Sequence, residues 1–241
     1  MKPIRNLVLA TALVLVAASS RSLAAGTVTG LYEFGANASS PSFASTDADA
    51  GSTAGSLALS ASLTTAGSGI STTSGNPIPQ LFLKGVNNST EALAISGAKY
   101  ITFTITPVAG TLSFHSLSFD YNRDTTTTAK FYGLYVSTVG FTAGSSIDTN
   151  STAFSSVTTF TNYSVVLSGI PSLQAVSGPV VFRLYFWGGT DANAIIRLDN
   201  ISLTTAAIPE PSTYALVASA GLFLLVLGRR QRRSATLRPG A

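Results

Sequence analysis

The sequence of 241 residues contains no cysteine and a single histidine, His115. Without cysteine, the chain has no disulfide bridges, no thiolate-bound zinc or iron–sulfur centre and no cysteine nucleophile. With one histidine, a metal site built from several histidine ligands is excluded. A Ser-His-Asp triad needs a histidine beside a nucleophile on a sharp turn. His115 stands instead in a strand-like segment, and no Gly-x-Ser-x-Gly motif occurs, so we expect no catalytic residues of these kinds.

Charge is also scarce, since charged residues make up 10% of the chain and hydrophobic residues 45%. The formal net charge of +4 is unevenly distributed. Residues 1–25 contain three basic residues and no acidic one, and residues 229–241 contain five basic residues. Residues 26–208 contain six basic and nine acidic residues. Phosphate binding needs clustered cations on the folded domain, so nucleic acid is not an expected partner.

The N-terminus has the three-part layout of a secretory signal peptide. Lys2 and Arg5 precede an apolar run over residues 7–18, and small residues follow it. We expect signal peptidase to cleave between Ala24 and Ala25, with the next bond as the second choice. The alternative is an uncleaved membrane anchor. A helix over the apolar run would reach only about 18 Å, short of a hydrocarbon core of roughly 30 Å.

The C-terminus combines a Pro-Glu-Pro motif, an apolar run and an arginine cluster. The motif residues are Pro209, Glu210 and Pro211. Both prolines lack an N–H and restrict the residue before them, so the motif is expected to stay extended and accessible. Residues 213–228 are predicted to form a transmembrane helix, of marginal length for a bilayer. Four arginines follow: Arg229, Arg230, Arg232 and Arg233. These stop translocation and place the C-terminus on the cytoplasmic side.

This arrangement closely resembles the PEP-CTERM sorting signal of bacterial exported proteins, over residues 209–233. The resemblance implies recognition by exosortase, a membrane protease-transpeptidase that would cut near the motif. Pro209, Glu210 and Pro211 would then be recognition residues of a substrate. A plain single-span tail anchor is the alternative, but it would need no Pro-Glu-Pro. We therefore expect the chain to consist of four segments: signal peptide 1–24, β-sandwich domain 25–206, sorting signal 207–233 and cytoplasmic tail tip 234–241.

The body between the two ends is predicted to be all-β. Residues 100–106 alternate cleanly, and no segment keeps an apolar period of 3.6 residues. The expected strands cover residues 28–34, 57–63, 80–84, 100–106, 112–121, 130–137, 163–167, 180–187 and 194–203. The alternation changes parity at His115-Ser116 and at Asp199-Asn200, which indicates a bulge at each place. This number of strands suggests a jelly-roll-like two-sheet β-sandwich.

Two further expectations concern how this sandwich is assembled. First and last strands commonly pair in such folds, which would place residues 31–34 beside residues 196–199. Residues 36–55 and 64–79 look like long loops. Residues 31–34, 181–188 and 197–203 resemble jelly-roll domains of carbohydrate-binding or lectin-like type. That resemblance implies a sugar-binding ancestry.

Two binding sites can be predicted in the body. The resemblance implies a calcium site shared by an acid near the first strand and one in the last, which here are Glu33 and Asp199. Alternatively, Asp199 hydrogen-bonds the backbone at its bulge. Tyr185 and Trp187 share one strand face and could form a stacking platform for a saccharide. Burial of both aromatic rings in the sandwich is the alternative.

A glycoside hydrolase has the least support, because such enzymes need two carboxyl groups at a defined separation. The carboxylates are scattered, and Asp120 and Asp124 are expected to cap a turn and pair with Arg123. We therefore expect a non-enzymatic, exported cell-envelope or extracellular-matrix protein with a structural or binding role. The body would lie outside the membrane, then at the cell surface or beyond. The alternative is an exopolysaccharide-binding module, stabilised by calcium.

Overall fold

The computed structural model describes residues 27–35, 39–47, 49–73, 79–108, 110–150, 152–154 and 157–206. Within these residues, no helix is long and apolar enough to cross a membrane. The expected cleavage site, sorting motif and arginine cluster lie outside the described residues: Ala24, Ala25, Pro209, Glu210, Pro211, Arg229, Arg230, Arg232 and Arg233. The same holds for the expected transmembrane helix 213–228.

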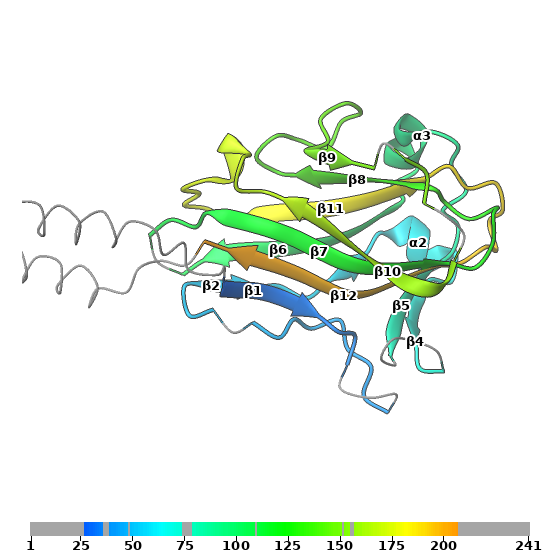
Figure 1. The fold of residues 1–241 in the computed structure, drawn as a ribbon, viewed down its shortest axis with the longest axis horizontal. Helices are drawn as coiled ribbons and strands as arrows, with labels where there is room; N and C mark the ends of the chain where they lie inside the picture. The colour runs from blue at the N-terminus through cyan, green and yellow to red at the C-terminus, as the bar shows by residue number, and fades with distance from the viewer. Residues whose placement is uncertain are drawn as a thin grey trace, which may run out of the picture. The chain divides into compact units, whose positions relative to one another are not determined.

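The first of two antiparallel sheets is built around the last strand of the body (Figure 1). Its members, in order across the sheet, are β10 (Val157–Val166), β7 (Phe114–Arg123), β12 (Ile196–Thr205), β5 (Gln80–Leu83) and β4 (Gly69–Ser71). A sixth strand, β1 (Thr27–Tyr32), pairs with the second half of β12. One edge of β12 is thus shared by β5 and β1, and the other edge pairs with β7.

The second sheet contains the remaining strands. Their order is β2 (Ser52–Ala54), β6 (Tyr100–Pro107), β11 (Val180–Trp187), β8 (Phe131–Val136) and β9 (Asp148–Thr149), with β3 (Ala58–Leu59) also on β6. Successive long strands alternate between the sheets, since β6, β8 and β11 lie in one and β7, β10 and β12 in the other. The body is therefore an all-β, jelly-roll-like two-sheet sandwich, as the sequence predicts.

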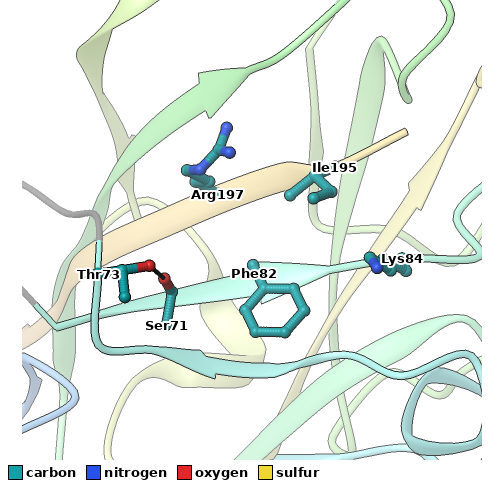
Figure 2. Close-up of a pocket in the computed structure, with 6 residues that line it drawn as sticks. All are labelled: Ser71, Thr73, Phe82, Lys84, Ile195 and Arg197. Atoms are coloured by element: carbon teal, nitrogen blue, oxygen red, sulfur yellow. Dashed lines mark hydrogen bonds between the residues drawn. The ribbon is translucent and has the colours of Figure 1, made fainter. Parts of the chain in front are cut away.

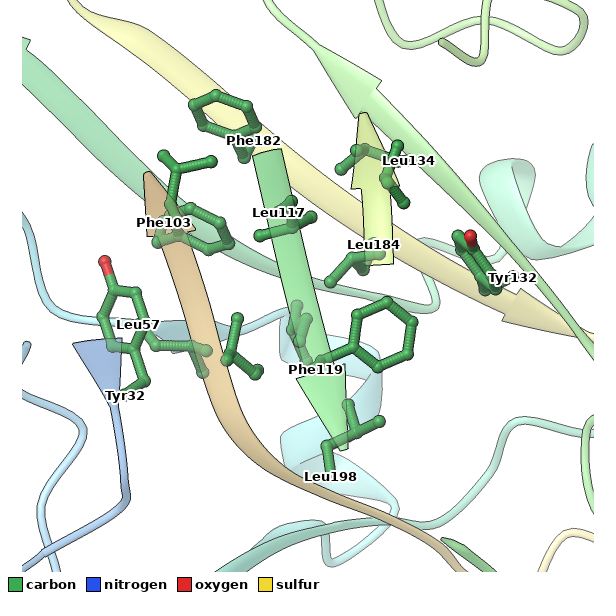
Figure 3. Packing of buried hydrophobic residues seen from close by; sticks show 14 of the residues in the cluster. Tyr32, Leu57, Phe103, Leu117, Phe119, Tyr132, Leu134, Phe182, Leu184 and Leu198 are labelled. Carbon is green, nitrogen blue, oxygen red and sulfur yellow. The ribbon is translucent and has the colours of Figure 1, made fainter. Parts of the chain in front are cut away.

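Strand alternation builds the core between the two sheets (Figure 3). In β6, Ile101, Phe103 and Ile105 are buried, and the threonines between them are partly exposed. The Phe103 ring stacks on Phe182 of β11 at 5.2 Å, and Phe114 of β7 meets Phe182 edge-on at 5.1 Å. Aromatic pairs of this geometry add about 0.5–1.5 kcal/mol to the burial of their surface. Rings from both sheets therefore hold the layers together.

Both predicted bulges are present where the alternation changes parity. The β7–β12 register shifts between Thr204 and Thr205, opposite Ser116 and Phe114, so that Phe114 and Leu117 are both buried. The second shift falls between Asp199 and Ser202, and Asn200 there has a positive φ of 48°. Each bulge adds a residue to one strand and lets its two halves both point apolar side chains inward.

Several local predictions are wrong. Residues 57–63 do not form one strand, because β3 ends at Leu59 and a helix, α2 (Ala61–Thr65), follows. Leu63 belongs to that helix and is buried in the core, so the apolar residues of 57–63 have the spacing of a strand without forming one. The expected loops contain β2 and β4, and residues 91–96 form helix α3. A 3-10 turn, η1 (Pro171–Leu173), precedes β11.

The predicted pairing of first and last strands is right, but its register is wrong. Tyr32 lies opposite Ile201, and the pairs continue to Thr27 opposite Thr205. The edge of residues 196–198, where residues 31–34 were expected, is taken by β5. Strand β1 is therefore displaced toward the C-terminal half of β12.

Candidate functional site

A pocket of about 300 Å³ opens on the outer face of the first sheet, at the end where β4, β5 and β12 lie together (Figure 2). It is lined by one aromatic ring, one aliphatic side chain, two hydroxyl groups and two cations. These residues are Phe82, Ile195, Ser71, Thr73, Lys84 and Arg197. Residues 71–73 and 82–84, which belong to consecutive parts of the chain, and the distant residues 195–197 supply them.

Strand alternation explains why Phe82 faces the pocket. Leu81 and Leu83 of β5 are fully buried in the core, so Phe82 between them points to the opposite face and is only half-buried. Phe82 pairs across the sheet with Arg197 on one side and with Gly69 on the other. A Cβ atom at Gly69 would lie 3.8 Å from a carbon of the Phe82 ring. Because Gly69 has no side chain, that edge of the ring stays uncovered.

The cations of the pocket differ in their surroundings. Arg197 forms an ion pair with Asp124, and its Nη1 donates to Asn122 Oδ1 at 3.5 Å. Burial lowers the pKa of Arg197, yet an arginine stays protonated near neutral pH. Lys84 has no ion pair with any described acidic residue. Its backbone N–H donates to Ser68 Oγ, which fixes the strand end from which its side chain projects.

Binding is the chemistry that this arrangement supports. An exposed ring surface beside hydroxyl and cationic donors can orient an amphipathic ligand. Among the described residues, no three His, Cys, Asp or Glu side chains come together as a metal-binding group. His115 is an exposed residue of strand β7, and the sequence likewise predicts it within a strand.

The predicted pair Tyr185 and Trp187 lies on the outer face of the other sheet. Tyr185 is 2% exposed, and its ring packs against Tyr100 and Tyr135, each at 5.1 Å. Trp187 is partly exposed and stacks on Phe131 at 6.2 Å. The ring of Tyr185 therefore packs within the protein, and a saccharide contact on this face would depend on Trp187.

Helix α3 (Glu91–Ser96) helps to cover this second face. The Tyr135 hydroxyl donates to Glu91 at the start of α3, and Ala94 of α3 is buried with Tyr135 and Tyr185. The Arg183 guanidinium lies 4.3 Å from the ring centre of Tyr100 and 4.0 Å from that of Phe141. These contacts form a second, smaller core. For Tyr185 the sequence alternative, burial of the ring, is therefore the one that the structure shows.

Asp199, the predicted calcium ligand of the last strand, is fully buried at the bulge. Its Oδ1 accepts a hydrogen bond of 2.9 Å from the Asn200 N–H, which is the local role foreseen as the alternative. Glu33 is exposed and comes directly after Tyr32, which pairs with Ile201 of β12. Calcium binding by Glu33 and Asp199 stays a prediction.

The expected pairing of Asp120 and Asp124 with Arg123 is wrong. Asp124 pairs with Arg197, and Asp120 accepts from the side-chain amides of Asn162 and Asn200, both at 2.8 Å. Arg123 is 3% exposed and hydrogen-bonds backbone and hydroxyl oxygens: Thr125 O, Thr128 Oγ1 and Phe154 O. Arg123 points inward from β7, so it cannot meet the outward-facing carboxylates.

No protein-family model and no curated protein matches this chain. Among solved structures, it is similar to the CBM22-1 xylan-binding domain of Paenibacillus barcinonensis Xyn10C, with a TM-score of 0.40 and 11% identity over 77% of this chain and 100% of that domain. It is also similar to the family 11 carbohydrate-binding module of Clostridium thermocellum, with a TM-score of 0.39 and 12% identity over 75% and 97% of the two chains. A third is the K3 adhesin domain of Lys-gingipain from Porphyromonas gingivalis, with a TM-score of 0.34 and 18% identity over 55% and 77%.

The pocket around Phe82 was not foreseen from the sequence. A usable signal lies in residues 80–84, where Leu81 and Leu83 alternate with Phe82 and Lys84. An aromatic residue and a lysine on the outward positions of a short strand indicate a ring exposed beside a charge.

Proposed function

We propose that this chain is an exported protein whose β-sandwich binds a polysaccharide through the pocket of β4, β5 and β12. The observation that carries the proposal is the half-buried Phe82 ring, left open beside Gly69 and surrounded by polar side chains. Among the described residues, Phe82 has no aromatic partner, so its ring is not part of an aromatic cluster.

The chemistry of a sugar ring fits such a surface. One face of a pyranose exposes mainly C–H groups, which can be removed from water by packing on an aromatic ring. Its hydroxyl groups then reach the rim of the pocket. There, Ser71 and Thr73 can donate or accept, and Lys84 and Arg197 can donate. A few polar groups around an apolar surface are typical of sites for small organic ligands.

The proposal includes export and sorting, which the sequence of the two ends supports. Signal peptidase would remove residues 1–24, and the tail of residues 207–233 would act as a PEP-CTERM sorting signal for exosortase. The apolar run before the arginines would hold the chain in the membrane with its body outside. Processing would then leave the body at the cell surface or in the extracellular matrix.

Saccharide binding can be tested with the full chain, purified in a non-ionic detergent and applied to a glycan array with and without calcium. We expect retention on at least one polysaccharide and its loss in Phe82→Ala. Trp187→Ala is the matched control, because it removes an aromatic ring from the other sheet. If binding is lost in Trp187→Ala and kept in Phe82→Ala, the binding site lies on the outer face of the second sheet instead. A chain that binds no glycan would contradict the proposal and favour a purely structural matrix role.

The sorting proposal needs a separate measurement. Mass spectrometry of the protein recovered from outside the producing cells should find a chain that begins at Ala25 and lacks residues 215–228. A Pro209→Ala, Pro211→Ala double variant should keep that segment, since the extended motif would be lost. Mature extracellular protein with residues 215–228 intact would rule out processing of the tail.

A further inference from the structure

We infer that the pocket on β4, β5 and β12 selects an acidic saccharide, one that carries a carboxylate or sulfate group. The inference rests on the proposed function, since it concerns the ligand of the same site. It comes from where the few cations of the body lie and from what surrounds each of them.

The body has six basic residues between 26 and 208, and two of them line this one pocket. Two of the other four are held by contacts within the protein. Arg123 is buried among backbone carbonyls, and Arg183 is enclosed between two aromatic rings. Lys84 and Arg197 differ from those two arginines, because they line an open pocket.

The pocket keeps a net positive charge after its internal pairing is counted. Asp124 neutralises Arg197, and the side chains of that pair keep 22% (Arg197) and 29% (Asp124) of their surface exposed. Lys84 has no described acidic partner to neutralise it.

The ring and the charges act on different parts of one ligand. Figure 2 shows Phe82 between Lys84 on one side and the Ser71–Thr73 pair on the other, with Arg197 on the neighbouring strand. A sugar stacked on Phe82 could point an acidic substituent toward Lys84 and its hydroxyl groups toward Ser71 and Thr73. A small anion would use the charge but not the ring, and a neutral sugar would leave the ammonium of Lys84 without a partner. An acidic sugar uses both.

The test compares pairs of polymers in which one member carries acidic groups and the other is neutral. The full chain in non-ionic detergent is titrated with polygalacturonate and with the same polymer after reduction of its carboxyl groups to alcohols. A second arm compares dextran sulfate with dextran, which separates a sulfate preference from a carboxylate preference. We expect about tenfold weaker binding to the neutral member of at least one pair, as expected for loss of one charge-assisted contact. Added salt should reduce this preference.

Two variants with the same change of charge assign the preference to the pocket. Lys84→Gln should remove most of the preference for the acidic polymer, so that the charged and neutral members of a pair bind with similar affinity. Lys130→Gln, at the residue directly before β8 of the other sheet, should bind like the unmodified chain. Circular dichroism of each variant checks that the sandwich is intact.

The outcomes separate this inference from the proposed function. Equal binding to charged and neutral polymers would overturn the acidic preference and leave saccharide binding in place. A preference that survives Lys84→Gln, or that is lost in Lys130→Gln, would also overturn it, because the charge would act elsewhere. If neither member of either pair binds, and the glycan array is also negative, then saccharide binding itself is contradicted.

Discussion

We predict that the sandwich unfolds cooperatively in alkali, because its interior contains neutral tyrosine hydroxyls. Tyr32, Tyr121, Tyr132 and Tyr135 are all buried, with at most 4% of each residue exposed. Burial is the main cause that raises the pKa of each above the usual value near 10.

Neighbouring carboxylates act in the same direction at two of these sites. The Tyr132 hydroxyl donates to Asp148 Oδ2 at 2.5 Å, and the Tyr135 hydroxyl donates to Glu91. A hydrogen bond to a carboxylate keeps the proton on the phenol, and the negative charge opposes ionisation. Both effects therefore raise the pKa further, after burial.

The size of the effect follows from proton linkage. Above pH 10 the unfolded chain loses each phenolic proton while the folded chain keeps it, so the free energy of unfolding falls as the pH rises. One tyrosine contributes about 1.4 kcal/mol per pH unit, and four together contribute roughly 5–6 kcal/mol per unit. A domain with a typical stability of about 5–15 kcal/mol should then unfold between roughly pH 11 and 13.

Absorbance at 295 nm, which reports tyrosinate, can be followed with circular dichroism during an alkaline titration. We expect the buried tyrosines to ionise in one step that coincides with loss of the β-sheet signal. Tyr121→Phe is the control, because the Tyr121 hydroxyl is buried without a hydrogen-bond partner in the described structure. Its removal should leave neutral-pH stability unchanged or raised and should lower the alkaline slope by about a quarter. Ionisation of all tyrosines near pH 10 in a protein that remains folded would refute the reasoning.

Three further substitutions test the packing. Phe182→Ala should lower the free energy of unfolding by about 3–5 kcal/mol in urea titrations, and a loss below about 1 kcal/mol would contradict its place in the core. Thr90→Ala removes the acceptor for the Leu93 N–H and should cost about 1 kcal/mol, with faster amide exchange confined to α3. Gly133→Ala places a Cβ 3.1 Å from the ring of Trp187 and should cost about 1–3 kcal/mol and change the emission of that single tryptophan.

The long strands could be predicted because their alternation is locally encoded. In β6, threonines alternate with Ile101, Phe103 and Ile105, and a register error there would turn the whole apolar set toward solvent. The bulges could also be predicted, since a change of parity has few other solutions. Helices α2 and α3 were missed because five or six residues are too short for helical periodicity to show.

The pocket could not be predicted because its geometry depends on which strands become neighbours. Phe82 is open only because Gly69 pairs beside it, and it meets a cation only because Arg197 pairs on its other side. Those three positions span more than half of the chain, and no local pattern encodes their adjacency. The same reason explains Tyr185, whose cover by α3 is a tertiary contact that strand parity cannot reveal.

The position of β12 has a consequence for the order in which the protein can form. β12, the last strand of the described residues, is the one that β1, β5 and β7 all pair with. Until β12 is available, each of those three strands has an unpaired edge, which is prone to association with other chains. Assembly of the first sheet thus depends on β12, and a chain that ended before Ile196 would lose its central strand.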